Sequence, residues 1–210
     1  MTTIIGLCGS LRRESFNGML LRAAAEAAPA GTSIELESIR EIPLYDGDLE
    51  EDQGLPRAVE RLKDRIAAAD GLLIATPEYN HSLPGVLKNA IDWLSRPAQD
   101  IPRVFGGRPV AIIGATPGPG GTALAQAAWL PVVRKLGMRP WCEGGLLISD
   151  AFMVFDKNGR ISDATTVLNV RRFIEGFAAF AAAERLHRVG PAARGAGERA
   201  AMPMVTKAAL

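Results

Sequence analysis

The sequence predicts an α/β fold of three layers, in which a five-stranded parallel sheet carries helices on both faces. Segments of strand type alternate regularly with segments whose apolar residues recur at the spacing of a helix. Two of the strand segments, residues 71–75 and 108–115, have continuous apolar middles, which is typical of strands covered on both faces. Since right-handed crossovers leave few topologies, we take the strand order to be 2-1-3-4-5.

The first two strands and their helices follow from the pattern of the N-terminal third. The first strand is predicted at residues 3–8 and leads through a loop, residues 9–17, into a helix. The second strand, residues 33–38, alternates apolar and acidic residues, which places it at an edge of the sheet. The acidic run at residues 50–52 is expected to be a solvated surface, and Pro56 is expected to open the next helix.

A surplus of apolar residues marks the helix at residues 85–96, which follows the third strand and its loop at residues 76–84. One stripe of this helix suffices to face the core, yet a second stripe contains Val86, Ala90 and Trp93. We interpret the second stripe as a contact between copies of the chain, in a homodimer or a tetramer. Burial on two sides within one chain is the alternative.

The fourth strand, residues 108–115, leads into a glycine-rich loop at residues 116–121 and then into a helix. Pro131 should kink or break this helix near residue 130. The apolar positions expected to face the core are Leu124, Ala127, Ala128, Val132 and Leu136.

The last third of the chain supplies the fifth strand and a closing helix. The fifth strand is expected within residues 141–149, and a tight turn at residues 156–159, where an Asn-Gly pair provides positive φ. The residues of the last helix that should pack inward are Val170, Phe173, Ile174, Phe177 and Ala181. Residues 1–189 are expected to form one domain, and residues 190–210 a flexible tail.

Composition excludes several classes of function. The chain has 210 residues and a net charge of +1, and its Lys and Arg residues are not bunched, which argues against nucleic acid as the main partner. No apolar run is long enough to cross a bilayer, and no secretion signal precedes the first strand. Cys8 and Cys142 fall on predicted strands too far apart for a disulfide, and no Cys or His spacing suits zinc. We therefore expect a reduced, cytoplasmic protein without a metal.

The loop at residues 9–17 gathers groups that bind phosphate. It holds two hydroxyls, Ser10 and Ser15, the amide of Asn17, and two arginines, Arg12 and Arg13. The first-turn N–H groups of the following helix have no partner within the helix, and the helix dipole adds partial positive charge there. A phosphate site is one interpretation. A plain helix cap, with Ser15 or Asn17 capping and the arginines solvated, is the other.

Two further loops lie at the same edge of the predicted sheet, outside the C-terminal ends of the strands, where such folds bind ligands. Residues 76–84 are dense in polar and aromatic side chains and are stiffened by two prolines. The glycines of residues 116–121 let a flat ligand approach the backbone closely. A phosphate tail with a flat polar ring is the ligand that the three loops describe, and flavin mononucleotide (FMN) fits best.

Other motifs are absent or incomplete. The chain has no Gly-x-x-x-x-Gly-Lys-[Ser/Thr] signature of nucleotide triphosphatases and no Gly-x-Ser-x-Gly elbow. A Gly-x-Gly-x-x-Ala match at residues 118–123 follows the fourth strand rather than the first, which argues against a dinucleotide fingerprint. Cys8 lacks the arginine that a cysteine phosphatase needs six positions later, because that position is Glu14.

The motifs together resemble the NAD(P)H-dependent FMN reductase family, flavodoxin-like proteins that include quinone, azo-dye and chromate reductases. The resemblance rests on Gly9-Ser-Leu-Arg12-x-x-Ser15-x-Asn17, on Pro77-Glu-Tyr-Asn80-x-Ser82-x-Pro-Gly85-x-Leu-Lys88-Asn89-x-Ile-Asp92-Trp93, and on the third loop. It implies that the first loop holds the FMN phosphate, the second the isoalloxazine ring, and the third the pyrimidine end. The implied cofactor-binding residues are Ser10, Arg12, Ser15, Phe16 and Asn17, then Pro77, Glu78, Tyr79 and Asn80, then Thr116 and Gly118.

One position departs from this resemblance, since Leu124 stands where the family often has an arginine. The resemblance implies an enzyme without a side-chain nucleophile that passes two electrons from NADPH or NADH through FMN to a small acceptor: a quinone, an azo compound, chromate or free flavin. It also points to an oligomer. A flavodoxin-type electron carrier and an FMN-binding sensor are the alternatives, although carriers are typically acidic and this chain is not.

Overall fold

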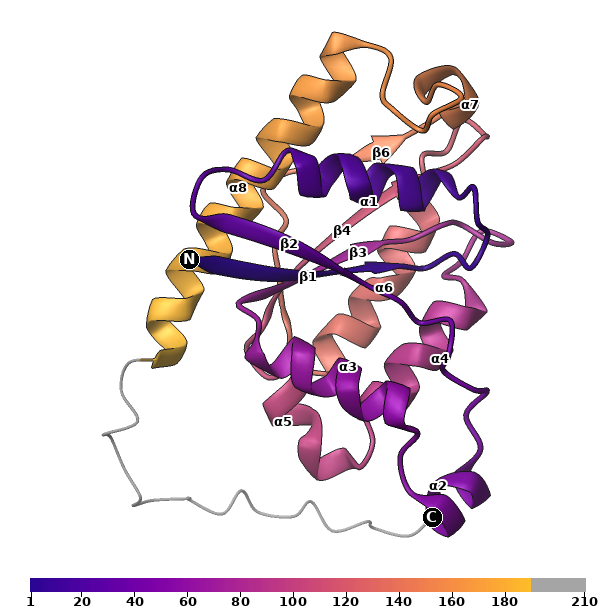
Figure 1. Cartoon of the computed structure of the whole chain (residues 1–210), viewed down its shortest axis with the longest axis vertical. Helices are drawn as coiled ribbons and strands as arrows, with labels where there is room; N and C mark the ends of the chain where they lie inside the picture. Colours follow the sequence, from indigo (N-terminus) through magenta and orange to yellow (C-terminus); the bar gives the residue numbers. More distant parts are fainter. Residues whose placement is uncertain (190–210) are drawn as a thin grey trace, which may run out of the picture.

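The computed structural model describes residues 1–189, with side chains described to residue 185, and shows one parallel sheet (Figure 1). The strands are β1 (Thr2–Cys8), β2 (Thr32–Glu37), β3 (Gly71–Ala75), β4 (Pro109–Ala115), β5 (Arg139–Pro140) and β6 (Leu147–Ile148). Their order is β2-β1-β3-β4-β5, with β6 also paired to β4, and every pair is parallel. The predicted order 2-1-3-4-5 is confirmed. The predicted tail, residues 190–210, lies outside the described residues.

Helices cover both faces of this sheet. They are α1 (Phe16–Glu26), α2 (Gly47–Gln53), α3 (Arg57–Ala68), α4 (Gly85–Leu94), a 3₁₀ turn at Ala98–Asp100, α5 (Ile101–Val104), α6 (Ala123–Lys135), α7 (Ala151–Val154) and α8 (Ala164–Val189). Helices α1 and α8 lie on one face, and α3, α4, α5 and α6 lie on the other (Figure 1). None of the helices in the described part of the chain combines the length and apolarity needed to cross a bilayer.

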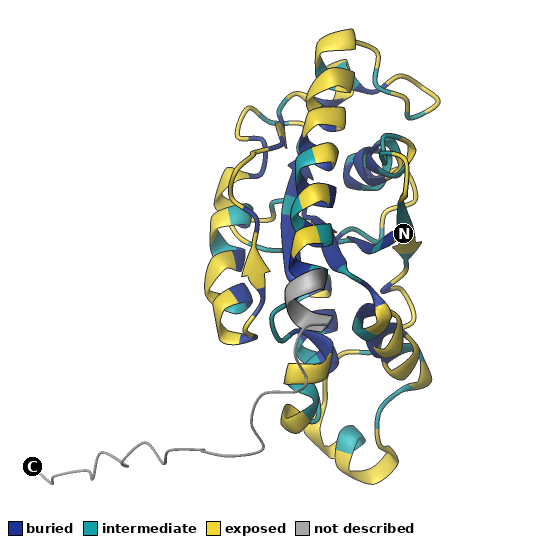
Figure 2. Cartoon of the chain, turned by 90° about the vertical axis from the view of Figure 1, so that its left-hand side faces the viewer, coloured by how far each residue is buried: buried dark blue, intermediate teal, exposed yellow. Residues whose placement is uncertain are grey.

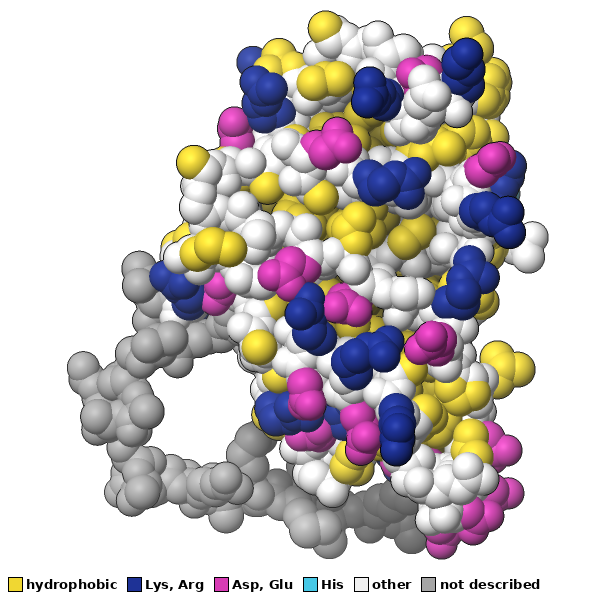
Figure 3. All heavy atoms as spheres, in the orientation of Figure 1, with side chains coloured by type: hydrophobic (Ala, Val, Ile, Leu, Met, Phe, Trp, Pro, Cys, Tyr) yellow, Lys and Arg dark blue, Asp and Glu magenta, His cyan; other side chains and the backbone are white. Residues whose placement is uncertain are grey.

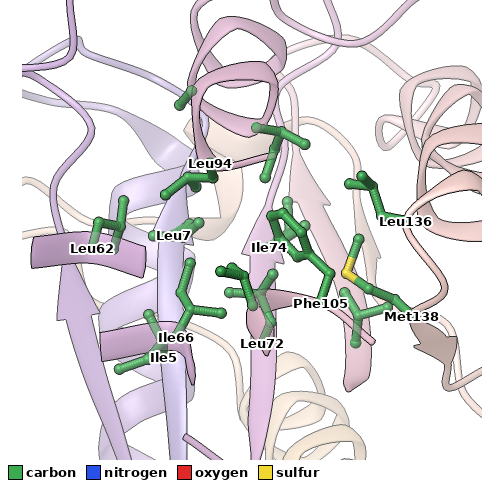
Figure 4. Packing of buried hydrophobic residues seen from close by; sticks show 14 of the residues in the cluster. Ile5, Leu7, Leu62, Ile66, Leu72, Ile74, Leu94, Phe105, Leu136 and Met138 are labelled. Carbon is green, nitrogen blue, oxygen red and sulfur yellow. The ribbon is translucent and has the colours of Figure 1, made fainter. Parts of the chain in front are cut away.

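Two apolar clusters hold the three layers together. The cluster under α3 to α6 interlocks strand residues such as Leu72 and Ile74 with Leu62, Ile66 and Phe105 (Figure 4). The cluster under α1 and α8 buries the inward residues predicted for the last helix: Val170, Phe173, Ile174, Phe177 and Ala181. Figure 2 shows the consequence, with buried strands behind α8 and an exposed outer side on the helix itself.

The predicted fifth strand within residues 141–149 is found only in part, since β6 lies in that range but β5 lies before it and the strand is interrupted between them. Strand β5 pairs with the start of β4 and β6 with its end. Trp141 N still donates to Val110 O at 2.8 Å and Leu146 O accepts from Gly114 N at 3.2 Å, so only residues 142–145 leave the ladder. Trp141 turns away to pack edge-on against Phe173, at a ring distance of 4.8 Å. A Cβ on Gly144 would lie 2.8 Å from the Trp141 ring, so the glycine makes this packing possible. Cys142 therefore lies outside a strand, and both cysteines are free.

Two of the three residues in the surplus stripe of α4, Ala90 and Trp93, are buried within their own chain, so the interpretation of Trp93 as a contact between copies is wrong. Ala90 and Trp93 are both 0% exposed, because the loop after β2 covers them. The Trp93 indole N–H donates to the Pro43 carbonyl at 3.0 Å, and the ring of Tyr45 packs edge-on at 4.9 Å. Asn89 fastens the same loop, donating to Pro43 O and accepting from Tyr45 N, each at 2.8 Å.

The acidic run also has a structural role that the sequence did not reveal. Residues 50–52 lie in α2; Glu51 and Asp52 are exposed, as predicted, whereas Glu50 is partly buried. Glu50 accepts hydrogen bonds from Arg96 Nε at 2.7 Å and from the Tyr45 hydroxyl at 2.9 Å. The Arg96 guanidinium, above all, lowers the pKa of Glu50.

Helix α6 faces the core with a partly different set of residues from the predicted one: Leu136, just after the helix, is buried as predicted and Val132 packs against the core, but Leu124 and Ala127 are exposed. Ala125, Trp129 and Val133 are buried, whereas Leu124 is 51% exposed. The orientation follows from the buried indole N–H of Trp129, which donates to Thr76 Oγ1 at 3.0 Å. The helix does not break near residue 130, since it continues through Pro131 to Lys135.

Asn17 connects α1 to the end of β4. Its side chain is 3% exposed; Nδ2 donates to the Ala115 carbonyl at 2.8 Å, and Oδ1 accepts from the Ala115 N–H at 2.9 Å. This pair of hydrogen bonds satisfies both backbone groups of a buried residue where the loop after β4 begins. It therefore holds the first and third loops in a fixed relation.

We expect Asn17→Ala to lower the free energy of unfolding by roughly 2–4 kcal/mol, because two buried hydrogen bonds are lost and the backbone groups of Ala115 stay unpaired. Denaturant titration of the purified variant measures the change. Asn169→Ala, at an exposed asparagine of α8, is the matched control and should stay close to the wild type. A similar small change in both variants would contradict the role given to Asn17.

Candidate functional site

Three loops meet at the C-terminal edge of the sheet: residues 9–15 after β1, 76–84 after β3 and 116–122 after β4. Ladder hydrogen bonds continue into them, from Gly9 N to Ala75 O and from Thr76 N to Ile113 O, each at 2.8 Å. A Cβ on Gly9 would lie 2.9 Å from Pro77 Cδ, so only glycine lets the first loop approach the second so closely. The structure thus brings together the three loops singled out from the sequence.

The first loop presents hydroxyls and arginines around the start of α1. Ser15 is the N-cap of α1, and its Oγ accepts from Gly18 N at 3.4 Å. Ser10 Oγ accepts from Arg12 N at 3.3 Å. Each hydroxyl still has a hydrogen to donate, although the buried Ser15 hydroxyl also interacts with the Cys8 thiol. Arg12 and Arg13 are exposed, and neither forms an ion pair with another described residue.

The backbone of α1 adds further donors to this loop. As the first two helical residues, Phe16 and Asn17 have N–H groups without a partner in the helix, and the dipole gives this end partial positive charge. The Asn17 side chain itself is occupied by Ala115. Of the two interpretations of this loop, the capping role of Ser15 is confirmed, and it leaves the anion-binding groups in place.

Arg40 is a residue of this region that the sequence analysis did not consider. Its guanidinium donates to the carbonyl of Leu11 in the first loop. The predicted order of strands could have found it, because Arg40 follows the second strand, which neighbours the first.

The thiol at the end of β1 is not a reactive one. Burial raises the pKa of Cys8, against smaller lowering effects from Ser10, Ser15 and Arg22. Its Sγ lies 3.5 Å from the Ser10 carbonyl, to which it donates. A raised thiol pKa favours the protonated form, which is the less nucleophilic one, so the surroundings of Cys8 do not activate its thiol.

The second loop ends in a tight two-residue turn. Asn80 and His81 both have positive φ, 52° and 59°. Tyr79 and Ser82 flank them and exchange backbone hydrogen bonds of 3.1 and 3.0 Å. This is the pattern of a type I′ turn. Tyr79, which flanks the turn, is 48% exposed, and Pro77, two residues earlier in the same loop, is buried.

Glu78 links the second loop to the helix after the third. Its Oε2 accepts from Leu124 N at 2.9 Å and from Ala125 N at 3.1 Å, so the carboxylate caps α6 from outside the helix. Its other oxygen lies 3.4 Å from His81 Nδ1. The sequence analysis placed Glu78 at the cofactor but missed this cap, because the two partners are 46 residues apart.

The third loop leaves its glycine backbone open. Thr116 Oγ1 accepts from Gly118 N at 3.4 Å, and Gly118 O accepts from Asp150 N at 3.1 Å. A Cβ built on Gly118 would meet nothing within 4 Å. Hydrogen bonds to Thr116 and Asp150 therefore fix the loop, while the space next to the Cα of Gly118 stays open for the approach of a flat ligand.

Residues of different loops thus converge on one edge with complementary chemistry. Donors for an anion surround the start of α1, an exposed aromatic ring stands on the second loop, and open backbone lies on the third. These features suit a flat ring with an anionic tail, so the site fits FMN.

Comparison with known proteins agrees with this fit. The family model described as NADPH-dependent FMN reductase matches residues 2–152. An NAD(P)H-dependent FMN reductase of Pseudomonas aeruginosa is 47% identical over 160 residues, which cover 76% of this chain and 84% of that protein. A 2-hydroxy-1,4-benzoquinone reductase of a Burkholderia species is 42% identical over 172 residues, which cover 82% of this chain and 92% of that protein.

A solved structure gives the same answer for the fold. FerB of Paracoccus denitrificans, a flavoenzyme NAD(P)H:(acceptor) oxidoreductase, superposes with a TM-score of 0.79 at 34% identity. The match covers 88% of this chain and 99% of that chain. With the family match over most of the sequence, the chain belongs to the NADPH-dependent FMN reductase family and is an oxidoreductase of that type, with FMN as its cofactor and NADPH or NADH as its co-substrate.

Proposed function

We propose that the chain passes two electrons from NADPH or NADH, through FMN at the three loops, to a quinone or another small acceptor such as an azo compound, chromate or free flavin. The observation that carries the proposal is the convergence of an anion-binding helix start, an exposed aromatic ring and open glycine backbone at one edge. FMN supplies the two-electron redox chemistry, so the chain needs no nucleophile of its own.

In this proposal the first loop holds the phosphate. The hydroxyls of Ser10 and Ser15 and the N–H groups of Phe16 and Asn17 donate to it, and Arg12 adds a charge-assisted contact. Asn17 contributes through its backbone alone, because Ala115 occupies its amide.

The second and third loops hold the ring. Tyr79 and Asn80 offer a stiff surface on the tight turn, and Pro77 supports it from below. Thr116 and Gly118 approach the polar end of the ring, where backbone N–H groups stabilise developing negative charge. Glu78 acts by holding the second loop against α6.

A quinone is the acceptor that the relatives favour, since one relative is named for a benzoquinone and others are named quinone reductases. The net charge of +1 argues against a flavodoxin-type carrier, which typically presents an acidic face to a basic partner. We also propose a cytoplasmic location, because both cysteines are free.

A homodimer or a tetramer remains part of the proposal, on different grounds from the stripe of α4. Of that stripe only Val86 is exposed, at 37%. Larger apolar side chains are exposed beside the third loop: Leu124 follows it in α6, Leu147 lies against Gly121, and Phe152 and Met153 follow Asp150, whose N–H donates to Gly118 O. Such residues favour a contact between copies near the site, and sedimentation at micromolar concentration measures the oligomeric state.

We expect the FMN-loaded protein to oxidise NADPH or NADH continuously when 1,4-benzoquinone is added, with a kcat on the order of 10 s⁻¹. Absorbance at the nicotinamide band follows the reaction. Without quinone, oxidation should be far slower. A protein that is reduced once but does not turn over with quinone would instead be a carrier or a sensor.

Arg12→Ala should weaken the binding of FMN about ten- to a hundredfold and leave the affinity for riboflavin nearly unchanged. The reason is that a charge-assisted hydrogen bond to phosphate contributes roughly 1.5–3 kcal/mol. Fluorescence titration of the apoprotein with each flavin gives both affinities. Arg13→Ala is the matched neighbour. If only Arg13→Ala weakens FMN binding, Arg13 contacts the phosphate. If Arg12→Ala lowers the affinity for FMN and for riboflavin equally, Arg12 does not contact the phosphate.

Glu78→Ala should lower the free energy of unfolding by about 1–2 kcal/mol, since α6 loses its cap. It should also weaken the binding of riboflavin and of FMN to the same extent, because the second loop is no longer held against α6. Thermal unfolding and the same flavin titrations test both effects. Glu51→Ala, at an exposed position of α2, serves as control. Unchanged affinity for both flavins in Glu78→Ala would refute the positioning role.

A further inference from the structure

A second group of guanidinium side chains surrounds a cavity between α1, α8 and the turn at residues 156–159. The cavity has a volume of about 410 Å³, within the range of small-molecule sites. Arg22 of α1, Arg160 after the turn and Arg171 of α8 line it. In the upper part of Figure 3, where α1 and α8 lie in the same view of Figure 1, basic side chains surround an apolar area.

The backbone that carries these arginines is well fixed. The turn before Arg160 is closed by Asp156 N to Arg160 O at 2.8 Å and by Arg160 N to Asp156 Oδ1 at 2.9 Å. The hydrogen bond from Arg160 N to the Asp156 carboxylate is the largest cause of the lowered pKa of Asp156. The turn therefore already uses this carboxylate. Arg171 follows the buried Val170 on α8. The three guanidinium groups are therefore presented by ordered elements.

The three arginines are not neutralised by a salt bridge within the described part of the chain, although Glu26 lines the same cavity and the Asp156 carboxylate interacts electrostatically with Arg160. None of their side chains forms an ion pair or a hydrogen bond with another described residue. The only carboxylate among the lining residues is Glu26. The arginines and Glu26 together leave a net charge of +2, which the dianion of a phosphate monoester balances. Guanidinium forks also match phosphate oxygens in geometry.

The floor of the cavity is apolar, which adds a second requirement for the ligand. The floor residues are Ala23, Ala27, Ile161, Val167 and Val170. Inorganic phosphate would leave this surface uncovered, whereas an organic ester would place its apolar body there.

We propose that this cavity binds a small phosphate monoester with an apolar body, at a site separate from the one for the FMN phosphate. None of the residues 9–15 lines this cavity. The Arg22 guanidinium lies between Gly18 of α1 and Gly159 of the turn, on the side of α1 that faces the cavity. A ligand held there by Arg22, Arg160 and Arg171 leaves the first loop to the cofactor.

The test is calorimetric titration of the FMN-saturated protein with phenyl phosphate at constant ionic strength. Saturating FMN fills the first loop, so new binding reports the second site. We expect saturable binding at millimolar concentration or below, and at least severalfold weaker binding of inorganic phosphate. No saturable heat up to about 10 mM, or equal affinity for the two anions, overturns the proposal.

Two adjacent arginines of α8 provide matched variants. Arg171→Gln should weaken phenyl phosphate about tenfold or more, as expected on losing a charge-assisted contact. Arg172→Gln removes the same charge from the next residue, which lines a different cavity, and should change the affinity less than about twofold, as for a charge on the protein surface. Equal loss in both variants indicates general attraction of anions and contradicts the site.

Further measurements separate this site from the cofactor site and from a structural role. Arg12→Ala should leave the affinity for phenyl phosphate unchanged; a matching loss there means that the anion binds the first loop instead. Without ligand, Arg171→Gln should melt no lower than Arg172→Gln, because Arg171 has no protein partner to lose. A lower melting temperature for Arg171→Gln alone overturns the proposal.

Discussion

The site depends on one buried side-chain amide. Asn17 pairs with both backbone groups of Ala115, so the start of α1 and the end of β4 keep a fixed relation although they are 98 residues apart. Glu78 does the same for the second loop and α6. Backbone hydrogen bonds that continue the sheet, such as Gly9 N to Ala75 O and Thr116 N to Ile148 O, also fix the loops, as does the close packing of Gly9 on Pro77. Polar side chains and backbone ladder bonds together therefore set the geometry of the edge.

Much of the fold could be predicted from the sequence, because it is written in local patterns. The continuous apolar run of residues 71–75 matches β3 residue for residue, and the 3.6-residue spacing of Val170, Phe173 and Phe177 gives the buried face of α8. The first-loop site followed in the same way, since a strand, a polar loop and a helix start are adjacent in the chain. The roles of the individual loop residues toward FMN stay predictions.

The errors share a different origin, in contacts between distant segments. In the sequence, Trp93 stands on a face of its helix for which no covering segment can be identified. In the structure, the loop with Pro43 and Tyr45 covers it. The fifth strand divides because Trp141 packs on α8, which no local spacing records. The face of α6 is set by one indole hydrogen bond to Thr76. Periodicity finds an element, whereas the partner that covers it must come from the assembled structure.

The type I′ turn of the second loop has a further consequence for ligand binding. Both central residues, Asn80 and His81, adopt left-handed backbone angles that non-glycine residues seldom visit in a free chain. The loss of conformational freedom at this turn therefore occurs when the protein folds, not when a ligand arrives. If a ligand binds beside Tyr79, as proposed, the turn is already ordered, and recognition there would be closer to lock-and-key than to induced fit.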